Sequence, residues 1–233
     1  MASGTSNLEG SKRGEKLRPK YSKVLEGKME PLKERILDIA YENKLSHLGS
    51  YFSSVGIIDE IYKHKKEKDI FILSSGHAAL ALYVVLEKYH GLNAEKLFKK
   101  HGGHPHRCED DFIHCSTGSL GMGLTVAVGR ALANKNIHVH CLISDGESYE
   151  GSIWESLAYI YEKNIKNITV HVNVNGYAAY KCVDSQNLVN RLKAFLPDIV
   201  IHYTDVGEYP FLSGLNAHYH IMDEDDYKLA KGA

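Results

Sequence analysis

The sequence predicts an α/β protein with a doubly wound, mostly parallel sheet and helices on both of its faces. Two observations predict this fold class: strand-like and helix-like runs alternate along the chain, and glycine-rich joints separate them. Such alternation is typical of sheets whose parallel strands are connected by helices. The 233 residues are enough for one large domain with a sizeable core. We find no internal repeat and no linker after residue 20, so we expect one domain.

The individual elements follow from the spacing of apolar residues. Helices are expected where apolar residues recur every three or four positions, at residues 30–42, 55–63, 78–89, 124–133, 151–163 and 186–194. Strands are expected at the short apolar runs 69–73, 137–143, 168–174 and 199–203. Ser53-Ser54 is interpreted as the start signal of the second helix. Residues 1–20 are polar and basic and are expected to be a flexible leader or expression remnant, with the domain spanning 21–233.

Composition narrows the function classes. The formal net charge of −1 argues against a nucleic-acid-binding protein, because such domains carry a basic excess. No apolar run is long enough to cross a bilayer, so no membrane partner is expected. The four cysteines show no Cys-x-x-Cys rhythm, which favours a reducing cytoplasm.

Two polar residues each follow a predicted strand and precede a glycine. Asp145 comes after strand 137–143, and Asn175 comes after strand 168–174. Because a strand–helix–strand unit brings both strand ends to one edge of a parallel sheet, these residues are expected to lie side by side. Carboxylate and amide oxygens suit Mg²⁺, and free amides at the next helix start suit a phosphate. The pair therefore predicts a diphosphate–metal site, although Asp-Gly and Asn-Gly are also common turn dipeptides.

Further loops make the pattern more specific. They are the runs Ser46-His-Leu-Gly-Ser50, Leu73-Ser-Ser-Gly-His-Ala-Ala79, Gly103-His-Pro105 and Ser116-Thr-Gly-Ser-Leu-Gly-Met-Gly123. Together with Ser144-Asp-Gly-Glu147 and Asn175-Gly176, they resemble, in order, the cofactor-binding half of transketolase. The resemblance covers about residues 30–222. It implies the thiamin diphosphate-binding fold, in the form called the PP domain.

The resemblance implies a binding role for particular residues. Mg²⁺, with Ca²⁺ or Mn²⁺ as substitutes, is expected on the side chains of Asp145 and Asn175 and on the carbonyl of Tyr177. The diphosphate is expected on the amides of Gly146 and Glu147 and near His77. The rest of thiamin diphosphate is expected against Gly118 and Leu120.

Four histidines are implied as catalytic residues. His47 and His104 would line the substrate funnel, His77 would approach the diphosphate, and His218 would reach the site from the late segment 215–220. His218 is only marginally preferred over His220. Without the resemblance, histidines at helix starts such as His47 and His77 are more simply explained as hydrogen-bonding a turn.

Other residues keep two interpretations. Glu150 and Glu155 match acidic positions at the family's subunit interface, or they are solvated helix positions. A zinc site is an alternative for the loop residues His101, His104, His106, Cys108, His114 and Cys115, although their spacing matches no standard zinc motif.

The chain also departs from the family pattern. Ser144 replaces the usual first glycine of the metal motif, and Leu48 replaces a proline. The segment 180–210 is shorter than usual, and Ala179 falls where a larger aliphatic residue faces the thiazolium. These departures leave the substrate preference open.

The resemblance implies the amino-terminal subunit of a split transketolase. No pyrimidine-binding domain fits in 233 residues. We therefore expect a partner subunit carrying that carboxyl-terminal half, an α₂β₂ assembly, and transfer of a two-carbon ketol unit between sugar phosphates. The alternatives are an α-subunit-like component of a 2-oxo acid dehydrogenase or decarboxylase, a specialised transketolase-like enzyme of sugar biosynthesis, and a non-catalytic scaffold.

Overall fold

The computed structural model describes residues 30–207 and 209–232, so the leader expected at residues 1–20 lies outside the described part. Its helices are α1 (Pro31–Glu42), α2 (Leu48–His64), α3 (Ala79–His90), α4 (Ala94–His101), α5 (Met122–Ala133), α6 (Gly151–Glu162), α7 (Ser185–Phe195) and α8 (Glu224–Lys231). Its strands are β1 (Ile70–Leu73), β2 (Val139–Ser144), β3 (Ile168–Val174), β4 (Tyr177–Ala178), β5 (Lys181–Cys182) and β6 (Val200–Tyr203).

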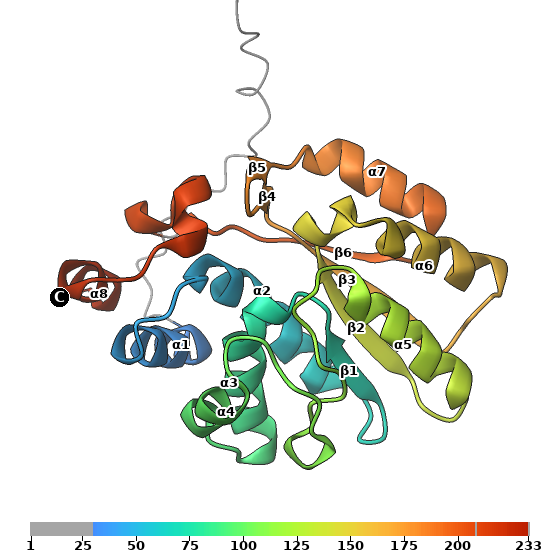
Figure 1. The fold of residues 1–233 in the computed structure, drawn as a ribbon, viewed down its shortest axis with the longest axis horizontal. Helices are drawn as coiled ribbons and strands as arrows, with labels where there is room; N and C mark the ends of the chain where they lie inside the picture. The colour runs from blue at the N-terminus through green and yellow to red at the C-terminus, as the bar shows by residue number, and fades with distance from the viewer. Residues whose placement is uncertain (1–29, 208, 233) are drawn as a thin grey trace, which may run out of the picture.

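Four of these strands form the central sheet, in the order β1-β2-β3-β6, and neighbouring strands are parallel. Helices cover both faces: α1 to α4 lie on one side, and α5 to α7 on the other (Figure 1). This arrangement confirms the expected fold class. Strands β4 and β5 form a separate antiparallel pair just after β3.

Two separate hydrophobic cores follow from the alternation of side chains along the strands. Phe71, Leu73 and Leu142 point into the core that contains α1, α2 and α3. Their neighbours Ile72 and Cys141 point into the core that contains α5, α6 and α7. Strands β1, β2 and β3 are therefore mostly buried on both faces, as is typical of parallel sheets, whereas the edge strand β6 is partly exposed.

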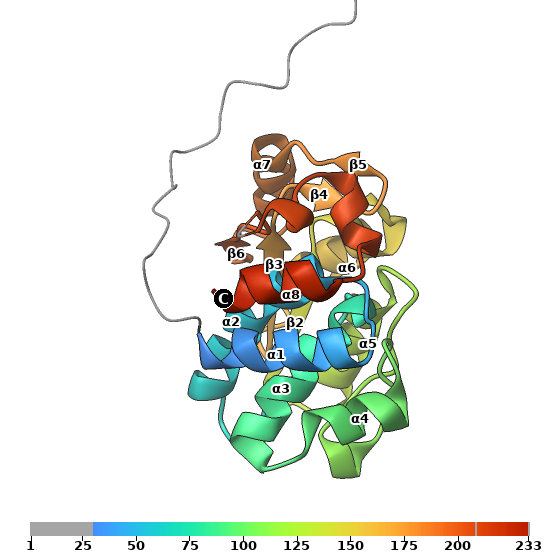
Figure 2. The ribbon, with the colours of Figure 1, turned by 90° about the vertical axis from the view of Figure 1, so that its left-hand side faces the viewer.

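The sequence pattern did not predict α8, which lies alongside α1 (Figure 2). Tyr227 of α8 stacks on Tyr41 with ring centroids 4.2 Å apart, and its hydroxyl donates to Asp38 at 2.8 Å. This contact between the two ends of the described chain brings the segment just before α8 back over the amino-terminal helices.

The expected start of the second helix at Val55 was wrong. Helix α2 begins seven residues earlier, directly after His47, and Ser53 and Ser54 lie buried within it. Their hydroxyls accept hydrogen bonds from the side-chain amide of Asn173, at 2.9 and 3.2 Å. The two serines thus join α2 to β3 and do not cap a helix.

Three histidines form a hydrogen-bonded ladder across the sheet. His171 Nε2 lies 3.3 Å from His140 Nδ1, and His171 Nδ1 lies 3.1 Å from His202 Nε2. Burial, and then the neighbouring imidazoles, lower the pKa of His171 from its ordinary 6.5 to about 3. The ladder is therefore neutral at physiological pH.

We expect this ladder to make the protein acid-sensitive. A histidine whose pKa is lowered by folding stabilises the fold above pH 6.5, and this contribution is lost as the pH falls toward the folded-state value. The lowered pKa of His171 alone should make the unfolding free energy about 2 kcal/mol smaller at pH 5 than at neutral pH. Urea unfolding between pH 7.5 and 5 measures this effect, and His171→Gln should flatten the pH dependence. His64→Gln, at an exposed position outside the ladder, controls for the loss of one imidazole, and an unchanged slope in His171→Gln would contradict the expectation.

No helix in residues 30–207 and 209–232 combines the length and apolarity needed to cross a membrane.

Candidate active site

The carboxyl ends of β2 and β3 bring Asp145 and Asn175 together. Asp145 is fully buried, and its Oδ2 accepts hydrogen bonds from the amides of Asn175 and Gly176, at 3.1 and 2.7 Å. Its Oδ1 accepts from the amide of Gly146 at 2.9 Å. Burial raises the pKa of Asp145 to about 6 despite these three donors. A divalent cation at this carboxylate would favour its charged form.

The side chain of Asn175 faces the chain that follows it. Its Oδ1 accepts from the amide of Tyr177 at 2.9 Å, which leaves a second lone pair of the same oxygen for another partner. Gly176, with φ of +85°, makes the turn that sends the chain from β3 into β4. Asn175 and Tyr177 thus lie within one short turn, and Asp145 reaches this turn from the end of β2.

The two amides expected to hold a diphosphate have local partners. The amide of Gly146 donates to Asp145, and the amide of Glu147 donates to Ser144 Oγ at 3.2 Å. Both belong to a 3-10 turn, Gly146–Tyr149, that precedes α6. A phosphate bound here would have to replace these hydrogen bonds.

The Glu147 side chain has a role that the sequence did not reveal. It is fully buried and accepts hydrogen bonds from Ser74 Oγ at 2.7 Å, from the amide of Gly121 at 2.8 Å and from the amide of Ser144 at 3.1 Å. One carboxylate therefore joins the end of β1, the end of β2 and the start of α5. Burial raises its pKa to about 7. A glutamate two residues after the aspartate that is expected to bind a metal carries no sequence signal for this role.

Three of the expected histidines form a cluster beside this edge. His47 lies 4.5 Å from His218 and 5.7 Å from His77 between ring centroids, and His77 lies 5.5 Å from His218. The amide of His47 also donates to the carbonyl of His218 at 3.1 Å. Burial, followed by the charge of His218, lowers the pKa of His47 to about 4 and that of His77 to about 3. Both rings are neutral at pH 7 and can donate from one nitrogen and accept at the other.

The late segment separates its two candidate histidines. His218 contacts His47 and His77, whereas His220 Nε2 lies 2.6 Å from the Asp226 carboxylate at the start of α8. The structure thus brings His218, and not His220, into the histidine cluster.

His104 lies against the glycine-rich loop before α5. A Cβ atom on Gly118 would lie only 3.0 Å from His104 Cδ2, so the loop passes directly beneath this ring. His104 is exposed, whereas Leu120 lines a cavity at the carboxyl ends of the strands. Glu150 and Glu155 are both exposed at the start of α6, as an interface or a solvated position would require.

A cavity of about 110 Å³ lies where these elements meet, lined by residues that include Gly49, His77, Leu120, Asp145, Asn175 and His218. A larger cavity of about 710 Å³ lies at the opposite edge of the sheet, near Asp69, His138 and Asn167, which precede the strands. Ligand sites in open α/β sheets lie at the carboxyl ends of the strands. The smaller cavity therefore marks the candidate site.

The site depends on a close approach of two loops at Gly76. A Cβ atom there would lie 2.6 Å from the carbonyl carbon of Thr117 and 2.7 Å from the amide nitrogen of Gly118. We expect Gly76→Ala to force these loops apart and to lower the unfolding free energy by roughly 1–3 kcal/mol in urea. Gly56→Ala is the matched control, because its Cβ meets nothing within 4 Å inside helix α2 and should slightly stabilise the protein. Equal stability of Gly76→Ala and the wild type would contradict the close approach.

The family model "Transketolase, thiamine diphosphate binding domain" matches residues 52–170, just over half of the chain. The chain belongs to this transketolase family. Mouse "Transketolase-like protein 2" is 39% identical over 120 residues, which cover 47% of this chain and 19% of that protein. One of the subunits of an apulose-4-phosphate transketolase from Phocaeicola vulgatus is 31% identical over 172 residues, which cover 65% of this chain and 61% of that protein.

Solved structures agree on the fold. Transketolase from Leishmania mexicana matches with a TM-score of 0.65 and 17% identity, covering 86% of this chain and 40% of that chain. The chain thus spans about a fifth of the mouse relative and less than half of this structure. The part of this chain that matches the family model contains the loop that carries His77, the glycine-rich loop before α5, and Asp145.

Proposed function

We propose that this chain binds the diphosphate end of thiamin diphosphate through Mg²⁺ and acts as one half of a two-chain transketolase. In this proposal, a partner chain supplies the pyrimidine-binding half, and the assembly transfers a two-carbon ketol unit from a ketose phosphate to an aldose phosphate.

A single geometric fact carries this function: the buried carboxylate of Asp145 lies beside Asn175 where two neighbouring parallel strands end. Mg²⁺ prefers oxygen ligands and is usually bound by one or two protein groups together with substrate phosphates. Asp145, the free lone pair of Asn175 and the Tyr177 carbonyl offer such a set. When bound, thiamin diphosphate supplies the nucleophilic carbon on which ketol transfer depends.

The histidines would bind the substrate through hydrogen bonds. His47 and His77 are neutral, so each can donate a hydrogen bond to a sugar hydroxyl or accept one from it. His218 packs against both rings and fixes their orientation. His104 is exposed beside Gly118, and we assign it a hydrogen bond with the incoming sugar.

The two-chain arrangement is supported by the Phocaeicola relative, whose name describes one subunit of a transketolase. We propose an α₂β₂ assembly in which the exposed Glu150 and Glu155 lie at the interface between chains. Cys108, Cys115, Cys141 and Cys182 are all free thiols, which is consistent with our proposal of a cytoplasmic location in carbohydrate metabolism.

A reconstitution assay tests the proposal. The chain, a pyrimidine-domain chain from the same organism and an equimolar mixture are each supplied with thiamin diphosphate, Mg²⁺, a ketose phosphate and an aldose phosphate. We expect transfer only in the mixture. Full transfer by this chain alone at high purity would refute the two-chain proposal, whereas turnover of a 2-oxo acid by the mixture, without ketol transfer, would refute the assigned reaction.

A further inference from the structure

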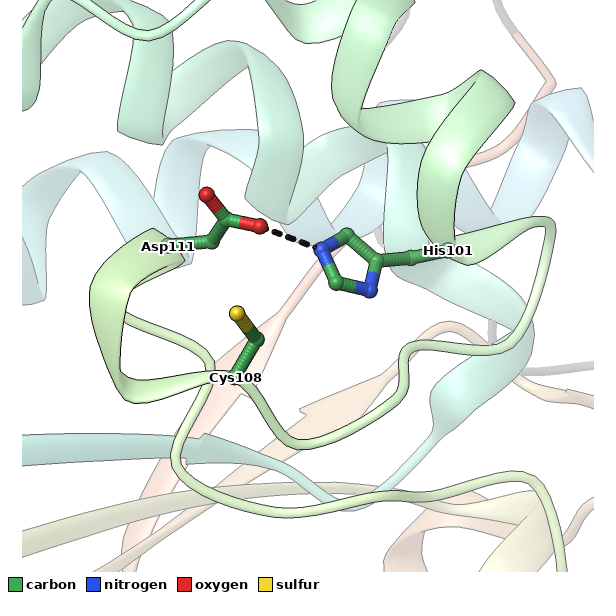
Figure 3. A group of neighbouring side chains, drawn as sticks. All are labelled: His101, Cys108 and Asp111. Carbon is green, nitrogen blue, oxygen red and sulfur yellow. Dashed lines mark hydrogen bonds and ion pairs between the residues drawn. The ribbon is translucent and has the colours of Figure 1, made fainter.

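Three side chains of different chemistry converge in the segment between α4 and α5. The ligand atoms of His101, Cys108 and Asp111 all lie within 4.8 Å of one another, and all three side chains face a common centre (Figure 3). Of the six residues that suggested zinc from sequence, only His101 and Cys108 belong to this group, and Asp111 was not among them. His114 instead lies 2.6 Å from the Glu109 carboxylate.

Regular backbone holds each of these side chains. His101 is the last residue of α4, and its ring is buried beside Tyr83. Cys108 and Asp111 lie at the two ends of a single 3-10 turn, which the Asp111 amide closes by donating to the Cys108 carbonyl at 3.1 Å. An antiparallel bridge between Cys108 and Ile113, with two hydrogen bonds of 2.9 and 3.0 Å, fixes this turn. The three ligand atoms are therefore brought together by the fold.

We propose that His101 Nε2, Cys108 Sγ and an Asp111 carboxylate oxygen bind Zn²⁺, with water as the fourth ligand. Imidazole, thiolate and carboxylate are the protein ligands of zinc, and the metal accepts three of them together with a water. The sulfur ligand selects Zn²⁺ over Mg²⁺, which the oxygen ligands around Asp145 suit instead. Binding releases the Cys108 thiol proton to solvent, and the proton of the neutral His101 ring lies on Nδ1 so that Nε2 is free to bind the metal.

The present contacts describe what the metal has to displace. His101 Nε2 and Asp111 Oδ2 are 2.6 Å apart, a hydrogen-bond distance. Zinc–ligand bonds of about 2.0–2.3 Å in a tetrahedron separate ligand atoms by about 3.3–3.7 Å, so the Asp111 carboxylate has to withdraw by about 1 Å. Asp111 side-chain exposure of 14% leaves it room on the solvent side.

Lys100 competes for the same position. Its ammonium lies 2.6 Å from Asp111 Oδ2 and 3.7 Å from Cys108 Sγ, where it supplies the positive charge that the metal would bring. Its side chain is 56% exposed, so it can turn into solvent when the metal binds. The Asp111 carboxylate thus already has a cation beside it in this structure.

Bound zinc would restrict the movement of a loop that carries a residue of the proposed active site. Residues 102–107 connect His101 to Cys108 and carry His104, which lies against Gly118. Fixing both ends of this short loop limits where His104 can move. This consequence rests on the proposed function, whereas metal binding itself does not.

Cobalt spectroscopy tests the proposal on the 233-residue chain without thiamin diphosphate. Co²⁺ is titrated in excess Mg²⁺, which occupies oxygen-only sites, and the sulfur-to-cobalt charge-transfer band is followed in the near ultraviolet. We expect one equivalent of tetrahedral Co²⁺ that Zn²⁺ displaces. Cys108→Ser should abolish the band, Asp111→Asn should weaken binding about tenfold or more, and Cys182→Ser, at an exposed cysteine elsewhere, should leave it unchanged.

Lys100 provides a test that does not depend on removing a ligand. We expect Lys100→Met to bind Co²⁺ about tenfold more tightly, because the competing ammonium is gone. Lys99→Met is the matched control, since Lys99 pairs with Glu95 on the same helix. Absence of the charge-transfer band in the folded wild type, its persistence in Cys108→Ser, or unchanged affinity in Lys100→Met would each overturn the proposal.

Discussion

Replacing Asp145 with alanine is expected to abolish Mg²⁺-dependent binding of thiamin diphosphate. The carboxylate is fully buried and is the one charged group of the expected metal-ligand set. Loss of a metal-binding carboxylate should exceed the effect of losing an outer hydrogen-bond partner, so we expect more than about 100-fold weaker binding. Asp145→Asn keeps the volume and should show the same loss.

Trp154 offers a direct readout of this variant. It is the only tryptophan of the chain, and its indole N–H donates to the carbonyl of Ser148 at 2.8 Å, within the turn that carries Gly146 and Glu147. Thiamin diphosphate titrations in Mg²⁺, followed by tryptophan fluorescence, measure the affinity. Asp184→Asn, which alters an exposed helix cap at α7, is the matched control and should bind normally. If a folded Asp145→Ala protein bound thiamin diphosphate with wild-type affinity, the assignment of Asp145 as a metal ligand would be contradicted.

Replacing His104 with alanine is expected to lower ketol transfer by roughly 10²–10⁴-fold while leaving cofactor affinity nearly unchanged. The ring is exposed and lies against Gly118, and it takes no part in the hydrogen bonds to Asp145. Its proposed contacts are with the substrate, so its loss should affect the transfer step.

The reconstituted two-chain assembly is needed for this measurement. Transfer rates and thiamin diphosphate affinity are compared between the wild type and His104→Ala, with His106→Ala as a control at an exposed histidine two residues further on. An equal loss of affinity and of transfer would give His104 a role in cofactor binding and contradict its assignment to the substrate.

Much of the sheet could be predicted from sequence, because buried parallel strands are short apolar runs between glycine-rich joints. Strand β3 has the expected bounds, 168–174, and β1, β2 and β6 lie within one or two residues of theirs. Helix α2 could not be placed correctly, since serines 53 and 54 are typical of helix starts but here bind Asn173 inside the fold. Helices α4 and α8 were missed because both are short and mostly polar.

The candidate site shows the same division between local and tertiary information. The neighbouring positions of Asp145 and Asn175 could be predicted because both residues end strands of one strand–helix–strand unit, which is recognisable from a continuous stretch of sequence. The Glu147 side chain accepts hydrogen bonds from Ser74 and from the amide of Gly121, which are far away in sequence. No pattern in the sequence predicts these contacts. Asp111 joins His101 and Cys108 only because a single turn of 3-10 helix aims it back toward α4.

Calorimetric titration of thiamin diphosphate into this chain, in Mg²⁺ and again in EDTA, tests the central claim most directly. We expect weak but measurable binding in Mg²⁺, because the pyrimidine half of the pocket belongs to the proposed partner, and none in EDTA. Adding a pyrimidine-domain chain should strengthen the Mg²⁺-dependent binding. Binding that is equally strong in EDTA, or no binding even with that chain present, would contradict the claim that Asp145 and Asn175 hold the diphosphate through a metal.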